Sequence, residues 1–193
     1  MAKTREKEHL PPRLEAVMIR LCRGADLNKT QAVKLPYLVD VIATHVLGTP
    51  ITEGFHQAWD HGVVTSQAWR HLDRCEQTSS PFRVEPVPFS EEQRIRLAEG
   101  VLDRELTPAQ QAIVDFVVQE FTAIPAGELG LMTKLMNPSI ATWGINHRAD
   151  TGEDAYERMS AEYQEMARRA SSLTLDSLRR SSIAITSIED VIA

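Results

Sequence analysis

The spacing of apolar residues, and the glycines and prolines that interrupt it, most constrain the fold of this chain. Leu14, Val17, Met18 and Leu21 fall at positions i, i+3, i+4 and i+7, which places them on one face of a helix. Gly24 follows at a point where glycine commonly ends a helix. The pattern predicts a short amphipathic helix in this part of the chain.

A second helix is expected from Thr30 to Leu47. Either Asn28 or Thr30 can cap its first turn, because both side chains accept hydrogen bonds from backbone N–H groups. Pro36 lies near the middle of this helix or in its first turn, depending on where the helix starts, and should kink it in the first case. Gly48-Thr49-Pro50 closes the helix.

The segment that follows predicts a small β element. Phe55, Gln57 and Trp59 stand at period two, which indicates a strand, and Asp60-His61-Gly62 indicates a turn. A short helix from Thr65 or Ser66 to Leu72 comes next. Residues 82–87 predict a second strand that pairs with residues 55–59, confined by its prolines to a sheet edge.

Three further helical segments are expected before residue 137. Ser90-Glu91-Glu92-Gln93 matches a capping box, so helical turns should follow as far as Leu102. Thr107 and Pro108 suit the cap and first position of a helix that runs to Phe121. Residues 126–136 predict another short helix.

The carboxy-terminal region differs in character. Residues 153–180 predict a long polar helix, on which Tyr156, Met159, Tyr163 and Met166 step by three and four positions. Such a narrow apolar seam suits another helix or a second subunit, so a homodimer is one alternative. The β-branched residues at the end of the chain predict a terminal strand or a docking segment.

Together these elements predict a mainly α-helical fold: a compact helical domain with a small β-hairpin or ribbon insertion, followed by a C-terminal helix and tail. We expect a flexible N-terminus over residues 1–13. The helical domain should span residues 14–150. A C-terminal helix and interaction tail should occupy residues 151–193.

Charge and composition restrict the class of partner. The net charge is -6 and the pI about 5.5, which makes nucleic acid an unlikely partner, although residues 1–35 carry eight basic and four acidic residues. The two cysteines form no CxxC motif, which favours a reducing compartment. The first residues lack the apolar run of a secretory signal, and no apolar stretch reaches membrane-spanning length. We therefore expect a cytoplasmic protein.

The residues needed for catalysis are not gathered in any familiar motif. His45, His56, His61 and His71 crowd one region, and His71 with Cys75 at i, i+4 makes the best metal hypothesis. Isolated histidines on mixed helices are usually hydrogen-bonded surface or core residues, so we expect no metal, no cofactor and no enzyme activity. The tryptophans lack interleaved basic residues and are interpreted as core or interface anchors.

Several blocks of sequence carry a family resemblance. Residues 34–40 read KLPYLVD and resemble a KLLYLAD-type helix, with Pro36 in place of an apolar residue. Residues 48–52 are similar to a G-x-P-I-T exit from that helix. Residues 61–64 lie where a YGPV motif is expected, with Val63 in place of the proline.

Two more features complete the pattern. Residues 106–129 resemble a pair of helices that begin LS and end near an eL motif, and Trp143 resembles a tryptophan that closes the domain. Over about residues 14–145 the chain resembles the Panacea domain, also described as the SocA-like antitoxin family.

The resemblance implies an antitoxin of a phage or prokaryotic toxin–antitoxin system. Members of the family neutralise a cognate protein toxin by direct binding, and at least one acts as an adaptor for proteolysis of its toxin. A proteolytic adaptor that engages a protease, and a DNA-binding autoregulator, are therefore the alternatives. The missing catalytic motifs are consistent with a binding protein.

The candidate partner-binding surface is the turn after the first strand, the nearby tryptophan and the carboxy-terminal seam. An apolar seam and tail outside a compact core need a partner to cover them. The predicted partner-binding residues are Tyr37, Trp59, His61, Gly62, Val63, Val64, Trp69, Tyr156, Met159, Tyr163 and Met166.

Overall fold

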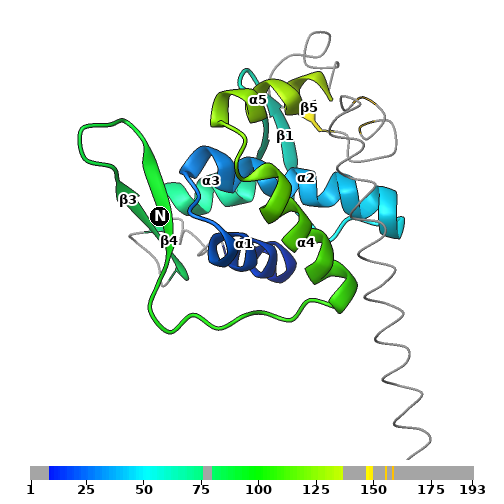
Figure 1. Cartoon of the computed structure of the whole chain (residues 1–193), viewed down its shortest axis with the longest axis horizontal. Helices are drawn as coiled ribbons and strands as arrows, with labels where there is room; N and C mark the ends of the chain where they lie inside the picture. The colour runs from blue at the N-terminus through cyan, green and yellow to red at the C-terminus, as the bar shows by residue number, and fades with distance from the viewer. Residues whose placement is uncertain (1–8, 76–79, 137–146, 150–154, 156–157, 159–193) are drawn as a thin grey trace, which may run out of the picture.

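A computed structural model describes residues 9–75, 80–136, 147–149, 155 and 158. Within these residues the fold is mainly α-helical with two small antiparallel sheets (Figure 1). Helix α2 (Lys29–Leu47) lies at its centre and contacts each of the other described helices. The mainly α-helical fold with a small β insertion is confirmed.

Helix α2 owes its central place to an almost unbroken run of buried residues. Every residue from Gln31 to Ala43 is buried. Asn28 caps the helix and forms a capping box with Gln31, whose side chain also reaches the carbonyl oxygens at the end of a distant helix. Pro36 lies inside the helix, and Gly48 ends it in the left-handed conformation with φ +73°.

The other described helices pack around α2. Helix α1 (Pro12–Gly24) and helix α4 (Pro108–Phe121) lie side by side, joined by Arg20 and Asp115, whose bidentate contacts are both 2.6 Å long (Figure 1). Thr107 caps α4 through a capping box, as the sequence predicted. Helix α5 (Ala126–Leu135) follows after Pro125.

The first sheet has the strand order β2-β1-β5. Strand β1 (His56–Trp59) forms a hairpin with β2 (Gly62–Thr65) and also pairs with β5 (His147–Arg148). All four residues of β2 are buried, which is why no alternation in the sequence indicated this strand. Helix α3 (Ser66–Asp73) follows directly, as predicted.

The second sheet corrects two predictions. Strand β3 (Phe82–Pro86) pairs with β4 (Gln93–Leu97), so the predicted pairing of residues 82–87 with residues 55–59 is wrong. The predicted helical turns after Ser90 are also wrong. The alternation Arg94-Ile95-Arg96 places Ile95 in the core at 1% exposure, and cross-strand pairing with β3 prevails over the local capping pattern.

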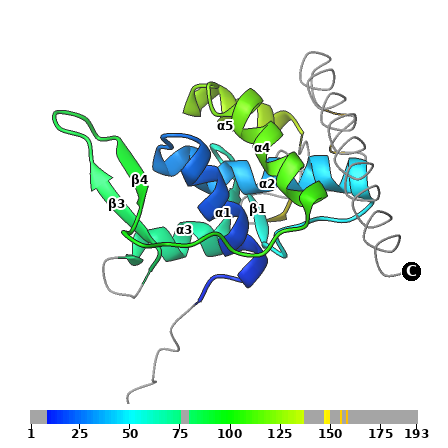
Figure 2. The same cartoon turned by 60° about the horizontal axis from the view of Figure 1, so that its bottom comes forward.

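The β3–β4 hairpin projects from the helical body in both views (Figures 1 and 2). The start of β4 is held to the start of α2 by a bridge between Asn28 and Arg94 and by a 2.9 Å bond from Ile95 N to Leu27 O. At its tip Phe89 is fully exposed and adopts φ +60°, an unusual conformation for an aromatic residue.

Apart from Ala155 and Arg158, the predicted carboxy-terminal helix and tail lie outside the described residues, as do Trp143 and residues 1–8. Of residues 151–193, Ala155 is buried, and Arg158 donates a 2.7 Å hydrogen bond to Met136 O at the end of α5. In the part of the chain that the structure describes, no helix combines the length and apolar character needed to cross a membrane.

Replacing Phe89 by asparagine should stabilise the protein. Asparagine tolerates the left-handed conformation better than phenylalanine, and Phe89 buries no surface that would be lost. We expect the free energy of unfolding to rise by about 0.5–1 kcal/mol in urea titrations. Leu102→Asn, at another exposed apolar residue outside the left-handed region, should change it by less than about 0.5 kcal/mol. Equal effects in the two variants would contradict the strain argument.

Candidate partner-binding site

A buried carboxylate organises the end of α2. Asp40 is 1% exposed, and its Oδ1 accepts hydrogen bonds from the backbone N–H groups of Ile51 and Thr52, each 2.8 Å long. Its Oδ2 accepts a bond of 2.5 Å from the Thr52 hydroxyl and lies 2.7 Å from His56 Nε2. These contacts join α2 to the segment that leads into β1.

The same contacts continue to a threonine. His56 Nδ1 lies 3.0 Å from Thr65 Oγ1, so an acid, an imidazole and a hydroxyl stand in line, as they do in some hydrolases. His56 and Thr65 are 3% and 0% exposed, and the imidazole packs edge-on against Tyr37 at 5.5 Å. The three groups satisfy one another in the core and line none of the hollows described below, so the arrangement serves to position the β1–β2 hairpin.

A second buried charge lies six residues earlier on α2. Lys34 is 2% exposed, and its Nζ donates hydrogen bonds to His61 O at 2.5 Å and Val63 O at 3.2 Å. Among the described residues no carboxylate pairs with it. Burial lowers the pKa of the Lys34 ammonium from 10.5 to about 8, because the charged form is poorly solvated.

Two glycines bring α5 against the hairpin. Gly62 has φ +95°, and a Cβ there would collide with Gly130 O and Thr133 Oγ1. A Cβ on Gly130 would lie 2.7 Å from His61 O, the carbonyl that accepts from Lys34. Side chains at these positions would therefore disturb the lysine's surroundings.

Thr133 completes this contact. Its hydroxyl donates to Gly130 O and accepts a 3.1 Å hydrogen bond from the N–H of Val63. A proline, which the YGPV motif has at this position, would bring no N–H. The buried threonine on α5 therefore satisfies the extra donor that valine introduces.

Two adjoining hollows of about 570 and 530 Å³ open beside Lys34. Residues of both hollows come from the start of α2, the β1–β2 turn and the start of α5, and four of them line both. We call this combined surface the Lys34 groove; the shared residues are Thr30, Lys34, His61 and Ala126.

The two halves of the groove differ in chemistry. The half beside α5 is lined by Lys134, Gly127 and Gly130, with Asp60 at the turn. The half beside α3 is lined by apolar and aromatic side chains and by residues from the turn between β3 and β4. The apolar residues there are Val33, Trp59, Val64 and Trp69.

The tryptophans of this half form a pair. The rings of Trp59 and Trp69 meet edge to face with centroids 5.3 Å apart. The Nε1 of Trp59 is buried, and no hydrogen-bond acceptor reaches it among the described residues. Paired indoles on a concave surface are typical anchor points for a protein partner.

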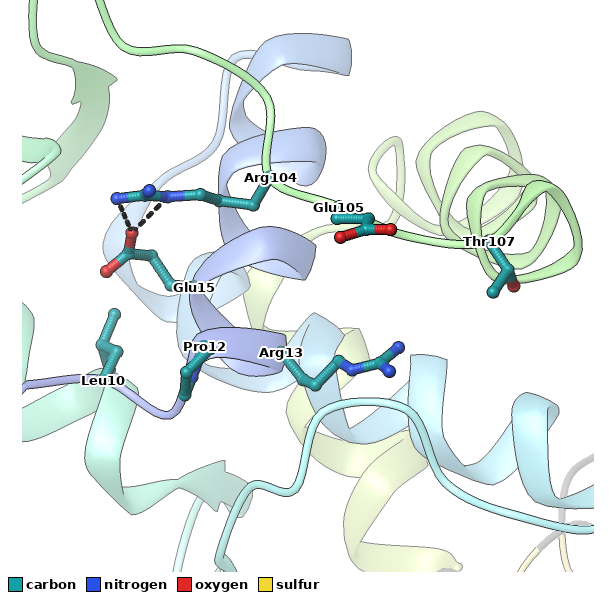
Figure 3. A pocket seen from close by; sticks show the side chains of 7 residues that line it. All are labelled: Leu10, Pro12, Arg13, Glu15, Arg104, Glu105 and Thr107. Carbon is teal, nitrogen blue, oxygen red and sulfur yellow. Dashed lines mark hydrogen bonds and ion pairs between the residues drawn. The ribbon is translucent and has the colours of Figure 1, made fainter.

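A third hollow, of about 520 Å³, lies between the starts of α1 and α4 (Figure 3). Three of its four charged side chains have partners: Arg104 contacts Glu15 at 2.8 Å, and Arg13 donates to Gln110 at 2.9 Å. Since most of its charge is already paired, this hollow is a weaker candidate than the Lys34 groove.

The structure distributes the predicted partner-binding residues among three places. Trp59, His61, Val64 and Trp69 line the Lys34 groove. Tyr37, Gly62 and Val63 are buried, so they shape the groove from behind rather than contribute exposed surface. The remaining four lie outside the described residues: Tyr156, Met159, Tyr163 and Met166.

Sequence reasoning missed the two buried charges of α2 as parts of the site. Lys34 and Asp40 stand alone in an otherwise apolar run, and that contrast was the available signal. The suggested metal pair also has a different environment. His71 Nε2 lies 2.7 Å from Ser80 Oγ, and no group of three His, Cys, Asp or Glu residues suited to a metal ion occurs in the described ranges.

The described residues form a small, mainly helical domain whose motif residues lie in its core and along one concave surface. The sequence profile of the SocA-like antitoxin family, Panacea domain, matches residues 33–138. The chain belongs to this family. Neither the curated proteins nor the solved structures include a significant match.

Replacing Asp40 by alanine should strongly destabilise the protein, because four donors would lose their buried acceptor. We expect the free energy of unfolding to fall by about 3–5 kcal/mol in urea titrations. Asp73→Ala, which removes an exposed contact with Lys29, should cost less than about 1 kcal/mol. Similar losses in the two variants would refute the central role of Asp40.

Stability should rise with pH because of Lys34. The unfolded lysine titrates near 10.5 and the folded one near 8, so between these values the unfolded state binds more protons. The cost of the buried charge is fully present below pH 8 and is lost by pH 10.5. The gain should be at most about 3 kcal/mol relative to Lys34→Met, measured by urea unfolding at each pH. Parallel pH profiles of the two proteins would show that Lys34 is not desolvated.

Proposed function

We propose that this chain is an antitoxin that neutralises a cognate protein toxin by direct binding through the Lys34 groove. The observation that carries the proposal is the groove itself, a concave surface beside the motif residues that holds paired tryptophans and an uncompensated buried lysine. Membership of the SocA-like antitoxin family supports a toxin as the partner.

Binding rather than catalysis is supported by the burial of the acid–imidazole–hydroxyl arrangement. Asp40, His56 and Thr65 are buried and satisfy one another. The groove, by contrast, offers aromatic surface and hydrogen-bond donors that a protein segment can cover. The proposed location is the cytoplasm, which is consistent with Cys22 and Cys75 not being joined in a disulfide.

Exposed apolar residues near the groove extend the proposed interface. Leu131 and Leu135 are more than half exposed, one turn apart on α5, and Leu131 also lines the groove. On the other side Phe89 is exposed in the β3–β4 turn, whose last residues border the groove. A toxin that covers the groove could contact apolar side chains at both ends.

The carboxy-terminal seam remains a separate prediction. A homodimer through Tyr156, Met159, Tyr163 and Met166, delivery of the toxin to a protease, and repression of the antitoxin's own operon are alternative or additional roles. The size of the complex with the toxin, measured by light scattering, separates a one-to-one complex from one built on an antitoxin dimer.

Co-expression with the protein encoded beside this gene tests the proposal. The neighbouring product should arrest growth alone, and the antitoxin should restore growth and co-purify with it. Trp69→Ala should weaken the purified complex at least tenfold in titration calorimetry, because an aromatic anchor is removed from the groove.

Leu102→Ala is the matched control, since Leu102 is exposed and lies outside the groove. It should restore growth as well as the original protein does. Growth arrest that persists with the unaltered antitoxin contradicts the antitoxin role. Full affinity in Trp69→Ala contradicts the assignment of the groove.

A further inference from the structure

We infer that the Lys34 groove recognises an acidic side chain, aspartate or glutamate, of the partner protein, and that this residue is flanked by an apolar one. The inference rests on the proposed function and adds the chemistry of the bound segment. It starts from a charge that the described fold buries without neutralising.

The surroundings of Lys34 favour the binding of an anion. An ammonium group carries three donors, and two of them are used by His61 O and Val63 O. These carbonyls orient the group but carry no net charge. A methionine would fill similar space without the desolvation cost. A lysine at this position is therefore best explained by a ligand that interacts with the charge of the ammonium group.

A second cation and a helix end face the same hollow. Lys134 lines it, with its Nζ 3.3 Å from Asp60 O. The first residues of α5, Ala126 and Gly127, also line it, and no side chain caps this ten-residue helix. The N–H groups of a first helical turn carry partial positive charge and bind carboxylates.

The acidic groups around the groove favour a carboxylate over a phosphate as the bound anion. Asp60 lies at the turn, Glu128 is in the first turn of α5, and Glu91 and Glu92 border the second hollow. Glu92 contacts Asn28 Nδ2 at 3.1 Å and Arg94 at 3.4 Å. A singly charged carboxylate tolerates these neighbours better than a doubly charged phosphate does, and this favours a protein ligand over nucleic acid.

The neighbouring half of the groove supplies the apolar requirement. Trp59 and Trp69 line the hollow that adjoins the lysine, and Lys34 and His61 belong to both hollows. A segment that places its carboxylate beside Lys34 therefore brings the next side chains over the tryptophans. The groove would therefore recognise a negative charge and an adjacent apolar side chain together.

The same geometry predicts how binding changes the protonation of Lys34. A bound carboxylate would favour the charged form of Lys34 and raise its pKa from about 8 toward the ordinary value. Besides the acids named above, the titratable and charged groups facing Lys34 are His61, Lys134 and Lys29; the Lys29 ammonium lies 3.4 Å from Asp73. Near pH 8 binding should therefore take up protons, whereas at pH 10 the preference for acids should weaken.

An array of acetylated, amidated nonapeptides tests the inference with the full chain. Their central triplet is Leu-X-Leu, where X is Glu, Asp, Gln or Asn, and the outer residues are Ala and Ser. At pH 7 the protein should retain the Glu or Asp peptides at least tenfold better than their amide counterparts. Lys34→Met should abolish this preference, and Lys134→Met, at an exposed residue, should reduce it severalfold.

Arg83→Met is the matched control, because Arg83 is an exposed cation that lines neither hollow. It should retain most of the preference. An equal loss in Arg83→Met and Lys34→Met would show general charge attraction and overturn the inference. Retention only of Leu-Gln-Leu peptides that carry a free carboxyl terminus, or of no acidic peptide, would overturn it too.

The array also separates this inference from the proposed function. If Trp69→Ala weakens the toxin complex but the array shows no acid preference, the antitoxin role stands and the acidic anchor is wrong. If the acid preference depends on Lys34 but the neighbouring protein neither arrests growth nor binds, the antitoxin role is wrong and the recognition chemistry stands.

Discussion

The carboxylate of Asp40 is the contact on which the rest of the described structure depends. It gathers hydrogen bonds from Ile51, Thr52 and His56, which follow it in sequence by 11 to 16 positions. These bonds turn the chain back from the end of α2 into β1 and fix the start of the hairpin. The hairpin in turn carries the carbonyl groups that surround Lys34.

Helix α2 thus buries two charges with opposite consequences. Both oxygens of Asp40 accept hydrogen bonds from matched donors in the core, so its role is to hold the fold. Lys34 meets only neutral carbonyl groups and lines an open groove. A buried charge that is satisfied stabilises one arrangement of the chain, whereas one that lacks a counter-charge favours a ligand that supplies it.

The helices were predictable because their signals are local. Asn28 and Thr107 cap α2 and α4, and Gly48 ends α2, each through contacts within a few residues. The second sheet was predicted incorrectly for the opposite reason. Ser90 to Gln93 resembles a helix start. Ile95, however, pairs with Val84, 11 positions away, and its N–H donates to Leu27 O, 68 positions away, and neither contact is part of a helical pattern.

Part of the candidate site was also predictable. Trp59 and Trp69 stood out as aromatic residues near a turn, and both line the groove. Lys34 did not stand out, because a lysine on a helix is usually exposed and only the fold shows that it is buried. The closeness of Gly62 to Gly130 was equally hidden, since nothing local relates residues so far apart.

The sequence by itself determined where most helices begin and end and to which family the chain belongs, because caps, breaks and motif spacing act over short stretches of chain. The tertiary structure decided which polar groups are satisfied within the core and which line a surface that a partner can contact. That distinction rests on hydrogen bonds such as Lys34 to His61, 27 positions apart, which exist only when the chain has folded.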